Sequence, residues 1–169
     1  MTTSVVIETA QGSIEIELFD DKAPRSVENF LKYVDEKHYD GTVFHRVIPG
    51  FMAQGGGYDG NMEKKSVRDA VENEGDNGVK NTRGTVAMAR TNEPHSATAQ
   101  FFVNVKDNTF LDHTGKNSTG WGYAVFGKVT SGMDVIDKIV GVPTGPKGPF
   151  AKDAPVENVV ITTTRRKEG

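Results

Sequence analysis

Cysteine is absent from the 169-residue sequence, which excludes disulfide bonds, thiolate catalysis and metal sites ligated by cysteine. Positive charge is not in excess either, because 20 Lys and Arg residues are outnumbered by 23 Asp and Glu residues. No apolar run is long enough to span a membrane, and no basic segment followed by an apolar one opens the sequence. We therefore expect a cytoplasmic protein that binds neither nucleic acid nor membranes.

The motifs of several common enzyme classes are missing as well. The histidines at positions 38, 45, 95 and 113 lack the spacing of a metal-binding pair, and there is no Gly-x-Ser-x-Gly nucleophile motif. The glycine run at 55–57 and the Gly-Lys pair at 115–116 are not followed by the residues that complete a phosphate-binding loop. No pair of carboxylates stands in an apolar setting. These absences predict a protein without a metal ion or cofactor.

Length and composition favour a single domain over residues 1–169. The hydrophobic content of 36% and the charged content of 25% are ordinary for a soluble globular protein. We expect the core within about residues 5–162, followed by a polar C-terminal tail. The basic cluster at 165–167 has no aromatic neighbours, so it is expected to be solvated rather than to bind a partner. The protein is expected to be a monomer.

Short strands dominate the predicted secondary structure. At residues 13–18, Ile14, Ile16 and Leu18 alternate with polar residues, as in a strand with one buried face. A turn separates this run from residues 5–7, which predicts a hairpin. With these two, eight strands are expected, at residues 5–7, 13–18, 42–47, 51–54, 85–89, 101–105, 124–129 and 156–162. Their number and spacing indicate an all-β barrel or sandwich.

Two segments have helical spacing instead. After Pro24, the apolar residues Val27, Phe30, Leu31 and Val34 fall on one helical face. A second stripe contains Met133, Ile136 and 139–140, and Ser131 with Asp134 predicts a capping box before it. A barrel has two open ends, which two amphipathic helices would cap. Residues 57–83 are expected to form a long loop, and residues 142–155 a turn-rich crossover.

The most informative segment is Phe-His-Arg-Val-Ile-Pro-Gly-Phe-Met-Ala-Gln-Gly-Gly at residues 44–56. It predicts a hairpin that carries Arg46 and Gln54 among large apolar side chains. Strand alternation places Phe44 and Arg46 on one face of the first arm, and Met52 and Gln54 on one face of the second. Arg46 faces Gln54 if the connecting loop has an odd number of residues, whereas a two-residue turn would separate them. The sequence leaves both registers open.

A second amide stands in a similar apolar setting at residues 99–104, Ala-Gln-Phe-Phe-Val-Asn. In an ordinary hairpin Phe44, Phe51 and Met52 would be core and Arg46 a surface cation. Gln100 makes that interpretation less favourable, because an amide beside aromatic residues needs hydrogen-bond partners. Two such amides, Gln54 and Gln100, predict a polar track on a partly apolar surface, which an extended peptide would satisfy.

These segments together resemble the cyclophilins, the peptidyl-prolyl cis-trans isomerase family, and in particular its bacterial cytoplasmic branch. The resemblance rests on residues 44–56, Gly-Thr-Val-Ala-Met-Ala at 84–89, residues 96–102 and Val-Phe-Gly-Lys-Val at 125–129. These segments keep the family's order, and the likeness extends from about residue 5 to residue 162. It implies an eight-stranded antiparallel β-barrel capped by two helices, and the register in which Arg46 faces Gln54.

The resemblance also implies which residues form the site. Arg46 would be catalytic, donating to the prolyl nitrogen of an X–Pro bond in peptides and in unfolded or folding proteins. A proline pocket would be formed by Phe51, Met52, Phe102 and Leu111, and the peptide groove would be lined by Gln54, Ala89, Arg90, Thr91 and Gln100. A non-catalytic proline-peptide binding or chaperone module of the same fold is the alternative. An unrelated β-barrel for small molecules fits less well, because the core is expected to be filled.

Two positions depart from the family pattern. Phe110 stands where the family often has Trp, and Tyr123 stands where it often has His. Both are expected at the rim of the substrate-binding site. Isomerase activity should survive these changes, whereas binding of cyclosporin should be weak. The loss of an indole N–H removes one hydrogen bond, worth about 1 kcal/mol.

Overall fold

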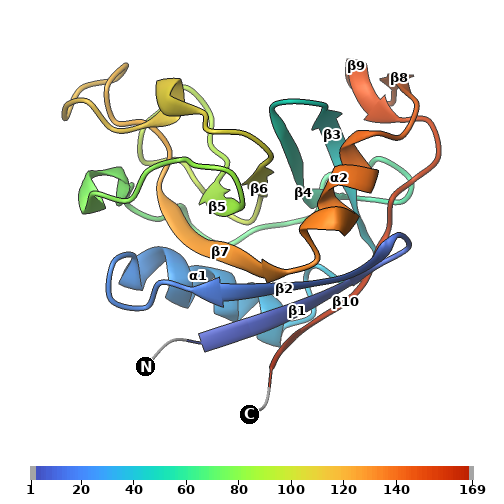
Figure 1. Cartoon of the computed structure of the whole chain (residues 1–169), viewed down its shortest axis with the longest axis horizontal. Coiled ribbons are helices and arrows are strands. Elements are labelled where there is room, and N and C mark those ends of the chain that lie inside the picture. The colour runs from blue at the N-terminus through green and yellow to red at the C-terminus, as the bar shows by residue number, and fades with distance from the viewer. Residues whose placement is uncertain (1–2, 168–169) are drawn as a thin grey trace.

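The computed structural model describes residues 3–167, and an eight-stranded antiparallel sheet dominates it (Figure 1). The order across this sheet is β10-β1-β2-β7-β5-β6-β4-β3. Its end strands approach each other through an isolated bridge between Val43 and Val160, and the Gly41 N–H donates to the Ile161 carbonyl at 2.8 Å. The sheet is therefore a nearly closed barrel, made of β1 (Thr3–Thr9), β2 (Gly12–Leu18), β3 (Thr42–Ile48), β4 (Met52–Asp59), β5 (Thr85–Met88), β6 (Phe101–Asn104), β7 (Val125–Ser131) and β10 (Ile161–Arg166).

The hydrophobic pattern explains how the first hairpin forms. β1 pairs with β2 in a register that runs from Thr3–Leu18 to Thr9–Gly12, leaving a two-residue turn. In β2, Ile14, Ile16 and Leu18 are buried and the residues between them are more exposed, as the alternation predicts. A slip of one residue would turn these three side chains to solvent, so burial fixes the register.

Both predicted helices are present, and both pack against the barrel core. Helix α1 (Pro24–Asp35) begins with proline at its first turn and buries Val27, Phe30, Leu31 and Val34. Helix α2 (Met133–Val140) buries Val135, Ile136, Ile139 and Val140. The predicted Ser131–Asp134 capping box is wrong, because Ser131 ends β7 and Gly132, at φ +98°, is the N-cap without a side-chain hydrogen bond. Glycine suits this left-handed conformation because it has no Cβ.

The N-terminus of α1 is capped by a distant side chain. Glu74 accepts hydrogen bonds from the backbone N–H groups of Arg25 at 3.3 Å and Ser26 at 2.7 Å, and from the Ser26 hydroxyl at 2.8 Å. Glu74 precedes the 3-10 turn η1 (Gly75–Asn77), and a second such turn, η2 (Thr109–Leu111), lies beside the site described below. The long polar segment at 57–83 thus stabilises the N-terminus of α1 through the carboxylate of Glu74.

The C-terminal third departs from the sequence prediction in two places. A hairpin of β8 (Thr144–Lys147) and β9 (Phe150–Pro155) forms where a turn-rich crossover was predicted. The last strand covers Ile161–Arg166 rather than residues 156–162, so Arg165 and Arg166 lie in β10 and not in a tail. Arg166 donates to Asp35 of α1 at 2.7 Å, which fastens this strand to the helix.

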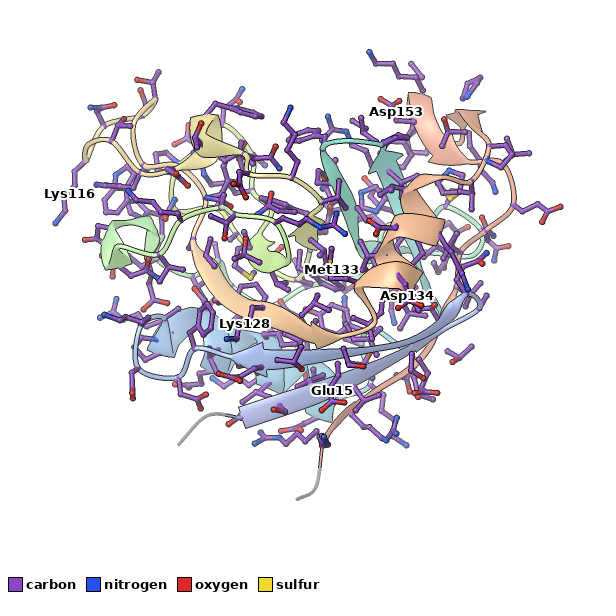
Figure 2. All side chains as sticks on the ribbon, viewed as in Figure 1. Glu15, Lys116, Lys128, Met133, Asp134 and Asp153 are labelled. Carbon is purple, nitrogen blue, oxygen red and sulfur yellow. The ribbon has the colours of Figure 1, made fainter. Side chains whose placement is uncertain are left out.

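Buried apolar side chains form two clusters, one inside the barrel and one outside it. The interior is filled by aromatic rings, with Phe30 5.7 Å from Phe101 and 5.1 Å from Phe126. Charged side chains such as Lys116 project from the surface (Figure 2). The second cluster lies on the outer face of the sheet and contains Met52, Ala87, Ala89, Phe102, Leu111 and Val125. A ligand therefore has room on the outer face and not in the interior.

Candidate active site

A β-bulge in β3 places the central arginine. Phe44 pairs with Gly55 and Arg46 with Gln54, so two steps along β3 match a single step along β4. The bulge breaks the expected alternation, and the prediction that Phe44 and Arg46 share a face is wrong. Phe44 packs into the barrel interior, 6.1 Å from Phe101, whereas Arg46 lies on the outer face. Bulges commonly re-aim a side chain in this way beside functional sites.

The loop of the same hairpin settles the register. Ile48 pairs with Met52, which leaves Pro49, Gly50 and Phe51 as a three-residue loop. Arg46 and Gln54 therefore face each other across the two strands, as the odd-residue alternative predicts. Gly50 has φ +74°, a conformation that glycine adopts without strain.

Arg46 is exposed and has free donors. Its guanidinium carbon lies 5.9 Å from the centre of the Phe51 ring, over one wall of the site. The ion pairs formed by arginines within residues 3–167 involve Arg25, Arg68, Arg83, Arg165 and Arg166, and none involves Arg46. A guanidinium keeps its protons at all physiological pH values. Arg46 can therefore donate hydrogen bonds to a bound ligand.

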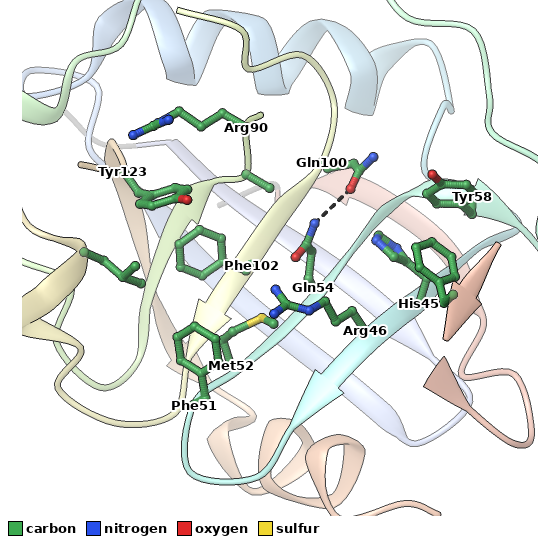
Figure 3. A pocket seen from close by; sticks show the side chains of 13 residues that line it. His45, Arg46, Phe51, Met52, Gln54, Tyr58, Arg90, Gln100, Phe102 and Tyr123 are labelled. Atoms are coloured by element: carbon green, nitrogen blue, oxygen red, sulfur yellow. Dashed lines mark hydrogen bonds between the residues drawn. The ribbon is translucent and has the colours of Figure 1, made fainter. Parts of the chain in front are cut away.

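An apolar pocket opens beside Arg46 (Figure 3). Met52, Phe102 and Leu111 of the outer cluster are between 2% and 8% exposed and form its floor. The Tyr123 ring stands edge-on to Phe102, with centroids 5.6 Å apart. The whole cavity measures about 260 Å³ and is lined by His45, Arg46, Phe51, Met52, Gln54, Tyr58, Ala89, Arg90, Gln100, Phe102, Leu111, Tyr123 and Phe150.

Two amides form a polar edge to this cavity. The Gln54 Nε2 donates to the Gln100 Oε1 at 2.9 Å, which engages one group of each amide (Figure 3). The backbone N–H of Ala89 donates to the Gln100 carbonyl at 3.0 Å and so fixes this strand. Gly57 leaves the space that the Gln100 side chain fills, since a Cβ at Gly57 would lie 2.5 Å from it. The predicted polar track is present, with both amides on the same cavity.

Arg90 is occupied by the protein itself. Its Nε donates to the Gly122 carbonyl at 2.9 Å, and its guanidinium carbon lies 4.5 Å from the centre of the Tyr123 ring. A cation over an aromatic face is a stabilising contact. Arg90 therefore holds Tyr123 at the edge of the pocket. Its main role at the cavity is to support this ring.

Three buried asparagines support the pocket walls from behind. The Asn108 Nδ2 donates to the Phe51 carbonyl at 2.9 Å, and the Asn81 Nδ2 donates to the Leu111 carbonyl at 3.2 Å. Asn104 joins the two, because it donates to the Asn81 Oδ1 at 3.1 Å and accepts from Asn108 at 2.8 Å. Buried amides that satisfy one another in this way rigidify the segments they connect.

Most of the predicted site residues meet at this cavity, and two do not. Thr91 bonds to Ser96 instead, through its hydroxyl at 2.8 Å, and does not line the cavity. Phe110 is 73% exposed and packs outside it, with its ring 5.6 Å from Phe51. All the others line it, namely Arg46, Phe51, Met52, Gln54, Ala89, Arg90, Gln100, Phe102, Leu111 and Tyr123.

The sequence prediction missed His45, Tyr58 and Phe150, which line the same cavity. Alternation puts His45 on the face opposite Arg46, and only the bulge brings both to one site. Burial lowers the pKa of His45 to about 4, and the neighbouring Arg46 charge acts in the same direction. The ring is therefore neutral at physiological pH and adds no second charge to the site.

Comparison with known proteins identifies the family. The family model described as "Cyclophilin type peptidyl-prolyl cis-trans isomerase/CLD" matches residues 4–166. The chain belongs to the cyclophilins. It is thus a peptidyl-prolyl cis-trans isomerase, an enzyme that acts on X–Pro bonds in proline-containing peptides and proteins.

Bacterial cyclophilins are similar over almost their whole length. The chain is 57% identical to peptidyl-prolyl cis-trans isomerase cyp18 of Streptomyces antibioticus over 96% of this chain and 98% of that protein. It is 54% identical to peptidyl-prolyl cis-trans isomerase B of Escherichia coli strain K12, over 97% and 99% of the two chains. The isomerase function therefore has support along the full chain.

Structural comparison supports the fold. A crystal structure of a Cryptosporidium parvum cyclophilin-type isomerase in the presence of the dipeptide Ala-Pro matches with a TM-score of 0.77 at 24% identity, over 98% of this chain and 99% of that one. Among residues 3–167, no group of three or more His, Asp or Glu side chains is arranged to hold a metal ion. In the same range, no helix has the length and apolar character needed to cross a bilayer.

Proposed function

We propose that Arg46 catalyses the isomerisation by donating a hydrogen bond to the prolyl nitrogen of the bound peptide. Rotation about an X–Pro bond is slow because resonance gives the C–N bond double-bond character, with a barrier of roughly 18–20 kcal/mol. A donor at the nitrogen localises its lone pair and weakens that resonance. The reaction transfers no proton between substrate and enzyme, so a donor that is always protonated suits it better than a titrating acid.

The single observation that carries this proposal is the free guanidinium of Arg46 beside an apolar pocket. A prolyl ring is apolar and would pack on Phe102 and Met52, which bury its surface away from water. The ring would then be held while the preceding carbonyl group rotates. Catalysis follows if the hydrogen bond from Arg46 is stronger in the twisted state than in either planar isomer.

Gln54 and Gln100 would bind the peptide backbone on either side of the rotating bond. Each retains hydrogen-bonding groups beyond the bond that joins them. An extended backbone presents N–H and C=O groups that match such a track. The substrates are therefore extended proline-containing segments in peptides and in unfolded or folding proteins. The enzyme that binds them would be a monomer of one domain.

A protease-free isomerisation assay with a proline tetrapeptide tests the role of Arg46. Removing one preorganised donor to a transition state typically costs about 100-fold to 1,000-fold in rate. We expect a loss of about 100-fold in kcat/KM for Arg46→Ala, and a partial loss for Arg46→Lys, which keeps the charge without the planar fork. Equal rates for Arg46→Ala and the wild type would remove Arg46 from the mechanism. A wild-type rate equal to the uncatalysed one would favour the alternative, a non-catalytic binding module.

A further inference from the structure

An aromatic cluster lies on the side of Arg46 away from the proline pocket (Figure 3). The His45 and Phe150 rings are stacked at an interplanar angle of 27°, with centroids 5.1 Å apart. The centroid of the Tyr58 ring lies 4.9 Å from that of Phe150, to which it is edge-on, and 4.8 Å from that of His45, against which it is tilted. These three rings line the same cavity as Phe102 and Leu111, so the cavity continues past Arg46.

Three separate elements bring this cluster together. His45 occupies the bulge of β3, Tyr58 follows the glycine run of β4, and Phe150 begins β9. The β8–β9 hairpin lies outside the barrel sheet and packs against β3. Its turn has Gly148 at φ +54°, and Phe150 follows two residues later. The hairpin thus adds one aromatic wall to a site that the barrel provides.

The chemistry of the cluster is apolar. His45 is 2% exposed and neutral, and among the described residues its Nδ1 has no hydrogen-bond partner. Tyr58 and Phe150 are only partly buried, so both residues keep some surface open to solvent, while the His45 ring stacks on Phe150. Within residues 3–167, no acidic side chain lines the cavity. Such a surface would bind an aromatic or large aliphatic side chain by stacking and burial.

We propose that His45, Tyr58 and Phe150 form a second subsite, which binds an aromatic or large aliphatic substrate side chain near the proline. This proposal rests on the proposed function, because it assumes that the prolyl nitrogen lies at Arg46. His45 adjoins Arg46 in β3, and an extended chain advances about 3.3 Å per residue. The side chain of a residue one or two positions from the proline therefore reaches the cluster.

Two series of proline peptides test the subsite. In one, the residue before proline is Gly or Phe, and in the other the residue after proline is Gly or Phe. A hydrophobic pocket discriminates by roughly 10-fold to 200-fold between side chains that do and do not fill it. We expect the wild type to have a kcat/KM about tenfold higher for the Phe peptide in at least one series.

Substitutions in the hairpin decide whether the cluster causes this preference. Phe150→Ala should reduce the Phe-to-Gly ratio to about twofold, and Phe150→Leu should leave an intermediate ratio because it keeps apolar volume. Lys152→Ala is the matched control, since Lys152 is exposed on the same strand and does not line the cavity. It should retain the wild-type ratio. Thermal unfolding of each variant reports whether the hairpin change has affected the fold.

Several results would overturn the proposal. A Phe-to-Gly ratio that Phe150→Ala leaves unchanged in both series would show that the cluster only fastens the hairpin to the barrel. An equal loss for Phe and Gly peptides would lead to the same conclusion. If the wild type accelerates none of the peptides, the proposed function itself fails. If it accelerates all of them equally, the subsite alone is wrong.

Discussion

At the scale of single residues, Arg46 and Gln54 determine each other's environment. They are paired across β3 and β4, and Gln54 also donates to Gln100 at 2.9 Å. A neutral amide opposite the guanidinium leaves the Arg46 donors free for a substrate. A carboxylate in the same place would form a charge-assisted pair with Arg46 and occupy those donors.

Gln54→Glu should therefore inhibit the enzyme in a pH-dependent way. At pH 7 the introduced carboxylate is ionised and pairs with Arg46, so we expect kcat/KM to fall about tenfold or more. The ordinary pKa of a glutamate is about 4.3, and the Arg46 charge lowers it. Activity relative to the wild type should thus recover as pH falls below about 4. Isomerisation assays from pH 7 to pH 3.5 measure this.

Gln54→Leu is the control for that prediction. It removes the amide and its bond to Gln100 without adding a charge. Its loss should be smaller than that of Gln54→Glu at pH 7 and independent of pH. Equal losses for the two variants would show that the amide bond matters and that pairing with Arg46 does not.

Phe110 offers a test of the expected weak cyclosporin binding. It lies outside the cavity, exposed and with its ring tilted against Phe51, so a larger ring fits there without repacking the core. Phe110→Trp adds an indole N–H donor, worth about 1 kcal/mol, and we expect cyclosporin to bind about fivefold more tightly. Calorimetric titration measures the change. An unchanged Kd would mean that the missing indole does not explain weak binding.

At the scale of secondary-structure elements, α1 depends on a carboxylate 48 residues away. Glu74 caps the Arg25 and Ser26 N–H groups, and Ala23 at the N-cap position provides no side-chain bond. We expect Glu74→Ala to lower the free energy of unfolding by about 1–2 kcal/mol, the usual cost of losing a cap. Urea denaturation measures this value.

Glu72→Ala is the matched control for the cap. Glu72 pairs with Arg25 on the surface, with its side chain 55% exposed. Exposed ion pairs contribute about 0–1 kcal/mol, so this variant should be nearly neutral. If both variants unfold at the same urea concentration, Glu74 does not cap α1 in solution.

Elements with strong local patterns were predictable from the sequence. Strands β1 to β7 and both helices overlap the predicted segments, most of which have a periodic apolar pattern. Strand β4 is longer than predicted, covering Met52–Asp59 and not residues 51–54, because its glycine run carries no apolar pattern. The β8–β9 hairpin has no such stripe, since β8 reads Thr-Gly-Pro-Lys and only part of β9 is buried. Its position depends on the packing of Phe150 against His45, which a local pattern does not encode.

The bulge at His45 limited the prediction of the site in a similar way. Alternation alone assigns Arg46 and Phe44 to one face and His45 to the other. Pairing with β4 decides otherwise, and the pairing depends on the close approach of Gly55 to β3, where a Cβ would lie 3.0 Å from the Val43 carbonyl oxygen. The two amides, Gln54 and Gln100, and the apolar residues beside them were predicted correctly to lie at one site, because an amide among aromatic residues is unusual in an ordinary strand.

At the scale of the whole molecule, the main hydrophobic core and the candidate site lie on opposite faces of the barrel sheet. Aromatic rings fill the interior, and the site lies on the outer face over a second apolar cluster. Side chains on the outer face can therefore vary without opening a cavity in the main core. Several residues that line the site are themselves buried, among them His45, Met52, Phe102 and Leu111.

His45 should make the stability of the whole fold depend on pH. Its pKa is about 4 in the folded protein, below the ordinary value of 6.5, so the unfolded chain binds this proton first. Stability is then fully present above pH 6.5 and falls as pH drops towards 4, by about 3 kcal/mol. Burial lowers the pKa of His38 too, which adds to the effect.

Urea denaturation at several pH values between 7 and 4 measures this dependence. His45→Gln removes the titrating group, so the free energy of unfolding of this variant should fall less steeply over that range. The difference in slope should correspond to the uptake of about one proton fewer on unfolding. The same slope in the variant and the wild type would mean that His45 titrates normally in the folded protein. In that case the site would carry a second positive charge at mildly acidic pH.

We propose that Arg46 acts on the rotating bond and does not merely bind the peptide. Exchange NMR of a proline peptide saturated with enzyme measures the cis-trans rate on the bound substrate, and titration of the same sample measures Kd. We expect Arg46→Ala to slow the exchange of bound peptide about 100-fold, while Kd changes less than about tenfold. An unchanged exchange rate at equal occupancy would show that Arg46 does not act on the rotating bond.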